Sequence, residues 1–285
     1  MFKIFFYRKK IRFYIEMSEK LLFHIAYYMT DKKRVDNKNS INKQSPEFNN
    51  HVFCGVCSFL KEIDSYSNFS VKRVVLDVNC ENTLVKKINP LDYPTVQLEI
   101  SCHSFEKEHP FRLTTKHRIA MNEKIDEYDW FGYSEDDTII SKETMKFMKD
   151  NAKAFYKKEN KVYTIPRMVF NQKGNYFYSD IITPSKVVQQ DYIVPTNRFG
   201  ACWIYPKEIM KDWVKCTSFL NFNHPNRDGG IRVKMGTGIL EKQAVIPINK
   251  EMKEPCIKCV HLGYSGKYYF KHPKGYHTLP IKKLF

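Results

Sequence analysis

The sequence lacks the long apolar runs of a membrane protein. No stretch reaches the ~20 consecutive apolar residues that a membrane-spanning helix needs. The first 20 residues mix Phe and Tyr with a basic cluster, and charge interrupts them too often for a secretory signal peptide. We therefore expect no transmembrane span. Residues 1–20 are taken as a basic aromatic extension, which is either a weak peripheral membrane anchor or a segment upstream of a functional start at Met17.

The sequence also lacks an internal repeat, a long linker, an arginine-rich helix and an RNA-stacking signature. Its 285 residues are 42% hydrophobic and 15% aromatic, which is enough for a substantial core. We expect one domain with an irregular second half. The net charge of +16 favours an anionic partner, either nucleic acid, anionic lipid or a phosphorylated small molecule, without choosing among them.

Cysteine is too sparse for a secreted disulfide scaffold, so we expect a reducing, cytoplasmic compartment. The eight cysteines include two C-x-x-C pairs, Cys54 with Cys57 and Cys256 with Cys259. Together they could hold zinc, but about two hundred residues separate the pairs. The first pair lies in the apolar run 51–60, which we predict to be a buried strand with the two side chains on opposite faces. Buried free thiols are therefore favoured over zinc.

Four apolar segments of the first half predict β-strands, namely Leu21–Met29, Val71–Asn79, Thr95–Ser101 and Asp129–Ser134. Between the third and the fourth, apolar residues of the segment 111–129 recur near helical spacing. Strands separated by helical or polar crossovers predict an α/β sheet covered on both faces. Ligands of such sheets bind beyond the carboxyl ends of the strands.

The second half is less regular. We expect a helix over Ser141–Asn160, a hairpin over 163–181, and a short strand followed by a helix that begins near Pro206. The aromatic run 199–205 either lines an acceptor pocket or, as we favour, belongs to the core.

Three consecutive carboxylates, Glu135, Asp136 and Asp137, follow the strand in YDWFGYSEDDTII. Ionised carboxylates at the end of a buried strand repel one another unless a cation or hydrogen-bond donors compensate. Mg²⁺ or Mn²⁺ prefers oxygen ligands and commonly bridges one or two carboxylates to substrate phosphates. The triplet therefore indicates a metal that carries a diphosphate. The alternative is a solvated acidic turn, with Asp137 or Ser141 capping the next helix.

The segment HPFRLTTKHRIAMNEKIDEYDWFGYSEDDTII, residues 109–140, resembles the centre of GT-A type nucleotide-sugar-dependent glycosyltransferases. In that family a helix leads into a strand that ends in a D-x-D-type metal motif, often written EDD. The resemblance covers roughly Leu21–Phe285. It implies a GT-A mixed α/β sheet flanked by helices, with a nucleotide-binding half over about 21–140 and an acceptor half over about 141–285.

The resemblance also implies roles for individual residues. Asp137, helped by Asp136 or Glu135, would hold the metal that bridges the two donor phosphates. His261, in CVHLGYSGKYYF, would be a further ligand of metal or phosphate; the alternative is an ordinary surface or core histidine. Arg118 would lie near the nucleotide or support the acidic strand, or it is a solvated arginine on the outer face of its helix.

An inverting enzyme of this family needs a carboxylate base for the acceptor hydroxyl. Asp228 in NRDGG is the candidate and Glu241 the reserve. The segment 231–240 has Arg and Lys where the family pattern suggests an acid, which leaves both the base and the stereochemical outcome open.

These observations predict a metal-dependent glycosyltransferase that uses a nucleotide-sugar donor and a glycan, protein or lipid acceptor, with no clear nucleic-acid partner. Two alternatives stay open. The basic surplus with interleaved Tyr and Phe suits a nucleic-acid-binding or nucleic-acid-processing protein, and the missing clear base suits a non-catalytic GT-A-like binding protein.

Overall fold

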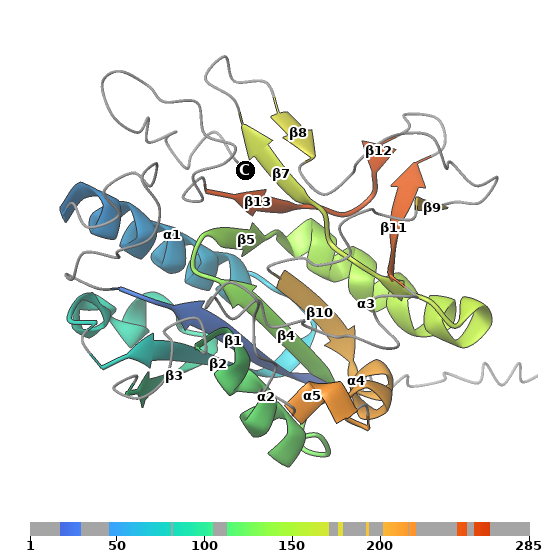
Figure 1. Ribbon diagram of the computed structural model, residues 1–285, viewed down its shortest axis with the longest axis horizontal. Coiled ribbons are helices and arrows are strands. Elements are labelled where there is room, and N and C mark those ends of the chain that lie inside the picture. Colours follow the sequence, from blue (N-terminus) through green and yellow to red (C-terminus); the bar gives the residue numbers. More distant parts are fainter. Residues whose placement is uncertain are drawn as a thin grey trace, which may run out of the picture.

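A five-stranded mixed sheet forms the centre of the computed structural model (Figure 1). Its order is β3-β2-β1-β4-β10, where β1 is Glu19–Tyr27, β2 Phe69–Asn79, β3 Val96–His103, β4 Trp130–Glu135 and β10 Cys202–Pro206. The first four strands run parallel and β10 runs antiparallel to β4. The four strands predicted in the first half, and the short strand before Pro206, are confirmed.

The structure describes part of the chain. The residues described are 18–29, 46–80, 82–104, 113–170, 176–178, 192–193, 202–215, 217–220, 244–249 and 254–262.

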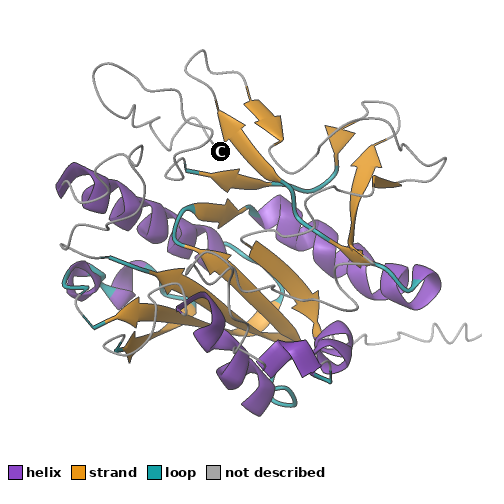
Figure 2. Ribbon diagram, in the orientation of Figure 1, coloured by secondary structure: helices purple, strands orange, loops and turns teal. Residues whose placement is uncertain are grey.

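Helices cover both faces of this sheet (Figure 2). Helices α1 (Pro46–Asp64) and α3 (Lys142–Glu159) lie on one side, and α2 (Leu113–Glu123), α4 (Lys207–Val214) and α5 (Thr217–Leu220) lie on the other. This arrangement confirms the α/β fold class predicted from the sequence. None of the described helices is long and apolar enough to cross a membrane.

The segment 51–60 is helical, so the prediction of a strand there is wrong. Burial along α1 recurs at spacings of three and four residues, which is the period of a helix packed on a sheet. The buried residues are Val52, Val56, Phe59, Leu60 and Ile63. The helix also changes the environment of the first cysteine pair, because Cys54 is exposed and Cys57 is half-buried. The expectation of buried thiols fails for this pair.

Strand β1 runs through the middle of the core, and every residue of Leu21–Tyr27 is buried. Phe23 points toward α1, where its ring packs edge-on against Phe59 at 5.3 Å between centroids. On the neighbouring strand, a Cβ at Gly132 would overlap the Phe23 ring. A glycine at this position therefore lets a large aromatic side chain lie flat across β4.

Helix α3 begins and ends as the sequence predicts. Ser141 is its N-cap and accepts a hydrogen bond from the backbone N–H of Thr144 at 3.2 Å. Asn160 ends the helix in the left-handed conformation, with φ of 51°.

A small sheet with the order β5-β13-β7-β8 follows the central one. Strand β5 (Thr138–Ile140) pairs with β13 (Cys259–His261), which pairs with β7 (Arg167–Phe170). Strands β7 and β8 (Tyr176–Tyr178) are antiparallel, which confirms the predicted hairpin. The remaining short strands and turns are β6 (Val162–Tyr163), β9 (Tyr192–Ile193), β11 (Ala244–Asn249), β12 (Glu254–Pro255), and the 3-10 turns Leu84–Lys87 and Pro90–Asp92.

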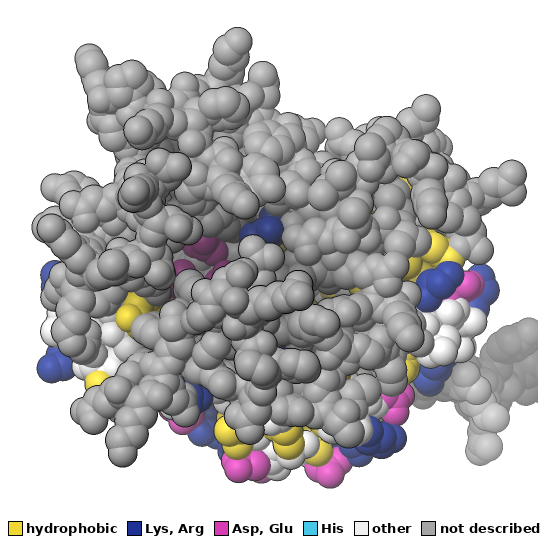
Figure 3. Space-filling view, in the orientation of Figure 1, with side chains coloured by type: hydrophobic (Ala, Val, Ile, Leu, Met, Phe, Trp, Pro, Cys, Tyr) yellow, Lys and Arg dark blue, Asp and Glu magenta, His cyan; other side chains and the backbone are white. Residues whose placement is uncertain are grey.

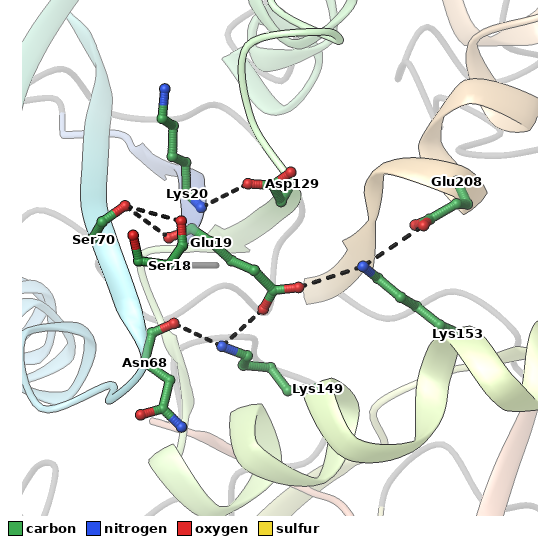
Figure 4. A network of polar contacts seen from close by, with 9 residues as sticks. All are labelled: Ser18, Glu19, Lys20, Asn68, Ser70, Asp129, Lys149, Lys153 and Glu208. Atoms are coloured by element: carbon green, nitrogen blue, oxygen red, sulfur yellow. Dashed lines mark hydrogen bonds and ion pairs between the residues drawn. The ribbon is translucent and has the colours of Figure 1, made fainter. Parts of the chain in front are cut away.

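Ion pairs fasten α3 to the amino end of the central sheet (Figure 4). Glu19 at the start of β1 accepts from Lys149 at 2.9 Å and from Lys153 at 3.4 Å. Lys153 also lies 3.6 Å from Glu208 on α4, so two carboxylates and two ammonium groups connect β1 with two helices.

We expect Glu19→Gln to lower the free energy of unfolding at neutral pH by about 1 kcal/mol. Burial raises the pKa of Glu19, but Lys149 and Lys153 outweigh it and the net pKa lies below 4.5. The stabilisation is therefore complete above the unfolded-state pKa and is lost as the pH falls through the lower folded-state value. Urea unfolding at about pH 7 and about pH 3 should show a smaller difference at the lower pH. Asp150→Asn, in an exposed pair with Lys146, is the control and should change little at either pH.

Candidate functional site

The order of the central strands places a ligand crevice between β1 and β4. Successive strands run outward from β1 to β2 and β3, and the chain then crosses back to place β4 on the other side of β1. The carboxyl ends of parallel strands on either side of such a reversal leave an open crevice. Strand β1 ends at Tyr27 and β4 ends at Glu135, so the acid triplet lies at this reversal point.

The acid triplet forms a tight turn between β4 and β5 that is held at several points. The backbone N–H of Tyr28 donates to Asp136 Oδ2 at 3.0 Å, which ties the turn to the end of β1. The buried Ser134 hydroxyl donates to the carbonyl of Thr138 at 2.7 Å and so connects the two ends of the turn. The turn is therefore an ordered part of the sheet edge. Near the centre of the face in Figure 3, acidic side chains are visible close to basic side chains.

The carboxylates crowd one another electrostatically. Burial and the charges of Asp137 and Asp136 raise the pKa of Glu135 to about 8, against the opposing charge of Arg167. Burial and the Asp136 charge also raise the pKa of the Tyr27 hydroxyl. A cation placed at this turn would relieve the repulsion, as the sequence suggests.

Asp137 is 8% exposed and accepts a hydrogen bond from the Thr138 hydroxyl at 3.1 Å. This burial contradicts the alternative of a solvated acidic turn for that residue. Ser141, rather than Asp137, caps the following helix.

The backbone of His261 lies beside the acid turn. Strand β13 places His261 directly opposite Thr138 in the register, and the next N–H, that of Leu262, donates to the Asp137 carbonyl at 2.7 Å. The structure thus brings together two segments that are more than a hundred residues apart in the sequence. A ligand role for the His261 side chain stays a prediction.

The donor chemistry of the turn fits a hard divalent cation. Among the described residues, no group of three or more His, Cys, Asp or Glu side chains is arranged to hold a metal ion by itself. A Mg²⁺ or Mn²⁺ ion that carries a diphosphate needs only one or two carboxylates, because phosphates and water complete its coordination. Asp136 and Asp137 at the strand end meet that requirement, and the mutual repulsion of the triplet favours a cation there.

Arg118 lies in the core beneath the sheet. Its side chain is 0% exposed, which contradicts the alternative of a solvated arginine on the outer face of α2. Its Nη1 donates to the carbonyl of Phe219 at 3.2 Å, and the guanidinium lies 5.7 Å from the Phe219 ring centre and 6.0 Å from that of Trp213. Burial lowers its pKa to about 10, with the Tyr133 hydroxyl acting in the opposite direction. A role in supporting β4 fits this position, and contact with a nucleotide stays a prediction.

The aromatic residues of β10 belong to the core, as favoured from the sequence. Trp203 and Tyr205 are 5% and 4% exposed, and their rings stack at 5.5 Å. Trp203 also packs edge-on against Trp213 of α4 at 4.9 Å. These side chains fasten α4 to the sheet, and the described part of the run, residues 202–205, is core.

Sequence reasoning missed a buried polar cluster on the face of the sheet that α2 covers. Asp77 of β2 lies between His24 of β1, whose Nδ1 is 2.7 Å from Oδ2, and His103 of β3, whose Nε2 is 3.0 Å from Oδ1. Asp77 is 2% exposed, and although burial opposes ionisation, both histidines lower its pKa below 3.8. The available signal was a single Asp inside the apolar strand VVLDVN.

The candidate bases Asp228 and Glu241 lie outside the described residues, as do residues 1–17 of the predicted extension.

No protein-family model and no curated protein sequence matches this chain. Among solved structures, a cytidylyltransferase from Leptospira borgpetersenii superposes with a TM-score of 0.32 at 12% identity, over 70% of this chain and 65% of that one. The 1–349 portion of S. aureus TarS superposes with a TM-score of 0.38 at 15% identity, over 80% of this chain and 57% of that one. The same portion in complex with UDP superposes with a TM-score of 0.34 at 12% identity, over 78% of this chain and 53% of that one. The chain thus spans less than two thirds of the length of these proteins, and likenesses this low assign no activity to it.

Proposed function

We propose that the protein is a metal-dependent glycosyltransferase of the GT-A type, which transfers a sugar from a nucleotide-sugar donor to an acceptor hydroxyl. One observation carries the proposal. An ordered turn with three consecutive carboxylates ends β4, at the point of the central sheet where the strand order reverses. Charged ligands of open α/β sheets bind at such points.

Asp137 and Asp136 would hold Mn²⁺ or Mg²⁺, with Glu135 in support. When bound, the metal neutralises negative charge on the departing nucleoside diphosphate, which stabilises the transition state. The protein itself holds the turn in a fixed conformation. The Tyr28 N–H holds the Asp136 carboxylate, and the Ser134 hydroxyl fixes the path of the backbone. Side chains held in place before the substrate arrives need no reorganisation during the reaction.

The remaining roles follow the resemblance and the positions found. His261 is proposed as a further ligand of metal or phosphate, because its backbone lies next to the turn. Arg118 is proposed to support β4 from beneath the sheet. Asp228 is proposed as the base that accepts the proton of the acceptor hydroxyl, with Glu241 as the reserve.

The division of the chain follows the same reasoning. Residues of about 21–140 would bind the nucleotide and those of about 141–285 the acceptor, which is a glycan, a protein or a lipid. The net charge of +16 suits an anionic donor.

A thermal-shift screen of nucleotide sugars tests this function. We expect at least one donor to raise the unfolding temperature by a few degrees in Mn²⁺, and by clearly less without the metal, because a ligand that binds only the folded state stabilises it. Single-stranded DNA is the matched anionic control. Stabilisation by DNA and by none of the sugar donors would instead favour a nucleic-acid-binding protein and would contradict the proposal.

A further inference from the structure

Helix α1 presents two cysteines that the proposed function does not use. Cys54 and Cys57 are three positions apart, and residues at this spacing lie on the same side of a helix. Cys54 is exposed and Cys57 is half-buried, so a small solute can reach the pair through Cys54. The helical conformation found for this segment is what brings the two thiols together.

Two buried tyrosines, Tyr93 and Tyr27, interact with the pair. Tyr93 acts on the Cys57 thiol, and both thiols act electrostatically on the Tyr27 hydroxyl. The Tyr27 hydroxyl in turn donates to Met29 Sδ at 3.0 Å.

The spacing of the pair favours a bridging cation over a disulfide. Cβ atoms three residues apart on a helix are about 5–6 Å apart, whereas a disulfide requires about 3.8 Å. A metal–sulfur bond is about 2.3 Å long in zinc–thiolate sites, so two sulfurs joined through one metal can lie up to about 4.6 Å apart. A cation can thus bridge the two sulfurs without unwinding the helix.

We propose that Cys54 and Cys57 form a binding site for one soft monovalent cation of the copper(I) class, with both sulfurs as ligands. Thiolates and thioethers select such cations over hard ones. Binding replaces the two thiol protons with one cation, so two protons are released and the site gains one net negative charge. Lys61, one helical turn after Cys57, acts electrostatically on that thiol and offsets this charge.

The second C-x-x-C pair of the chain is a matched control. Cys256 is exposed, whereas Cys259 is 0% exposed in β13, with its thiol 3.5 Å from the carbonyl of Pro166. Its sequence spacing is the same as that of the helical pair, but its local structure differs.

Silver(I) serves as a redox-inert probe in competition with a small thiol ligand, on protein kept reduced by a phosphine. We expect Cys54→Ser and Cys57→Ser each to weaken the tightest silver site at least about a hundredfold, because losing either sulfur removes the chelate. The double variant Cys54→Ser/Cys57→Ser should lose no more silver affinity at this site than either single variant. Cys256→Ser/Cys259→Ser should leave this site unchanged. Because Cys54 is exposed, Cys54→Ser is expected to fold, and its unfolding temperature serves as the check.

Retention of the tight site in Cys54→Ser would overturn the proposal, as would additive losses from independent thiols. A loss of silver affinity in the Cys256→Ser/Cys259→Ser variant equal to that in Cys54→Ser would also overturn the proposal. The thiolate-to-metal charge-transfer absorbance gives a second readout. It should appear with the first equivalent of silver in the wild type and be absent at that point in Cys54→Ser.

Discussion

Asp137→Asn is expected to lower sugar transfer, or donor hydrolysis in the absence of an acceptor, by at least about a hundredfold in Mn²⁺. The substitution keeps the size of the side chain and its hydrogen bond with the Thr138 hydroxyl, but it removes one of the charges that would hold the metal. Because Asp137 lies at the ordered end of β4, the fold should stay intact. The measurement is kcat/KM with the donor identified by the thermal-shift screen.

Asp150→Asn is the control for this experiment. Asp150 is exposed on α3 and pairs only weakly with Lys146, so both activity and stability should stay close to those of the wild type. If the wild type binds a donor with Mn²⁺ but neither transfers nor hydrolyses it, the protein is a non-catalytic binding protein of the same architecture. If Asp137→Asn keeps full activity, the acid turn does not hold the metal.

Asp77→Ala is expected to cost about 3–5 kcal/mol of the free energy of unfolding. The carboxylate is buried between His24 and His103 and joins three adjacent strands. Its loss removes the partner of His24 Nδ1 and leaves His103 Nε2 with only the Ser101 hydroxyl. Urea unfolding at neutral pH measures the change. Glu99→Gln removes a partly exposed partner of Arg73 from the same sheet, and it should cost less than about 1 kcal/mol.

The effect of Asp77 should depend on pH with a defined sign. The folded-state pKa lies below the ordinary 3.8, so the stabilisation is complete above 3.8 and is lost as the pH falls through the lower folded-state value. The difference between the wild type and Asp77→Ala should therefore shrink in strong acid. Equal costs for Asp77→Ala and Glu99→Gln at neutral pH would mean that the cluster contributes no more than a surface ion pair.

Strands β1, β2 and β4 could be predicted from the sequence because they are compact apolar runs, and β1 is buried along seven consecutive residues. Strand β3 could be predicted because its apolar and polar residues alternate. The first cysteine pair shows the limit of that reasoning. A ten-residue apolar run fits a strand or one face of a helix equally well. The period becomes visible only when it is extended to Ile63, past the charged Lys61 and Glu62.

Some features of the candidate site could be predicted from the sequence and others could not. The acid turn could be predicted because all three carboxylates follow one strand, so local order alone places them at the sheet edge. The His24, Asp77 and His103 cluster could not be predicted, because its members come from three strands and meet only through the pairing register. The burial of Arg118 depends likewise on α5, which lies about a hundred residues further along the chain.

The most direct test of the central claim is a crystal soaked with Mn²⁺ and a nucleoside diphosphate, with manganese located by its anomalous scattering. The account predicts manganese in contact with the carboxylate of Asp137 or Asp136, and the two phosphates bound to the same ion beyond the ends of β1 and β4. Manganese and diphosphate bound together elsewhere on the protein, or an ordered acid turn that binds neither, would contradict it.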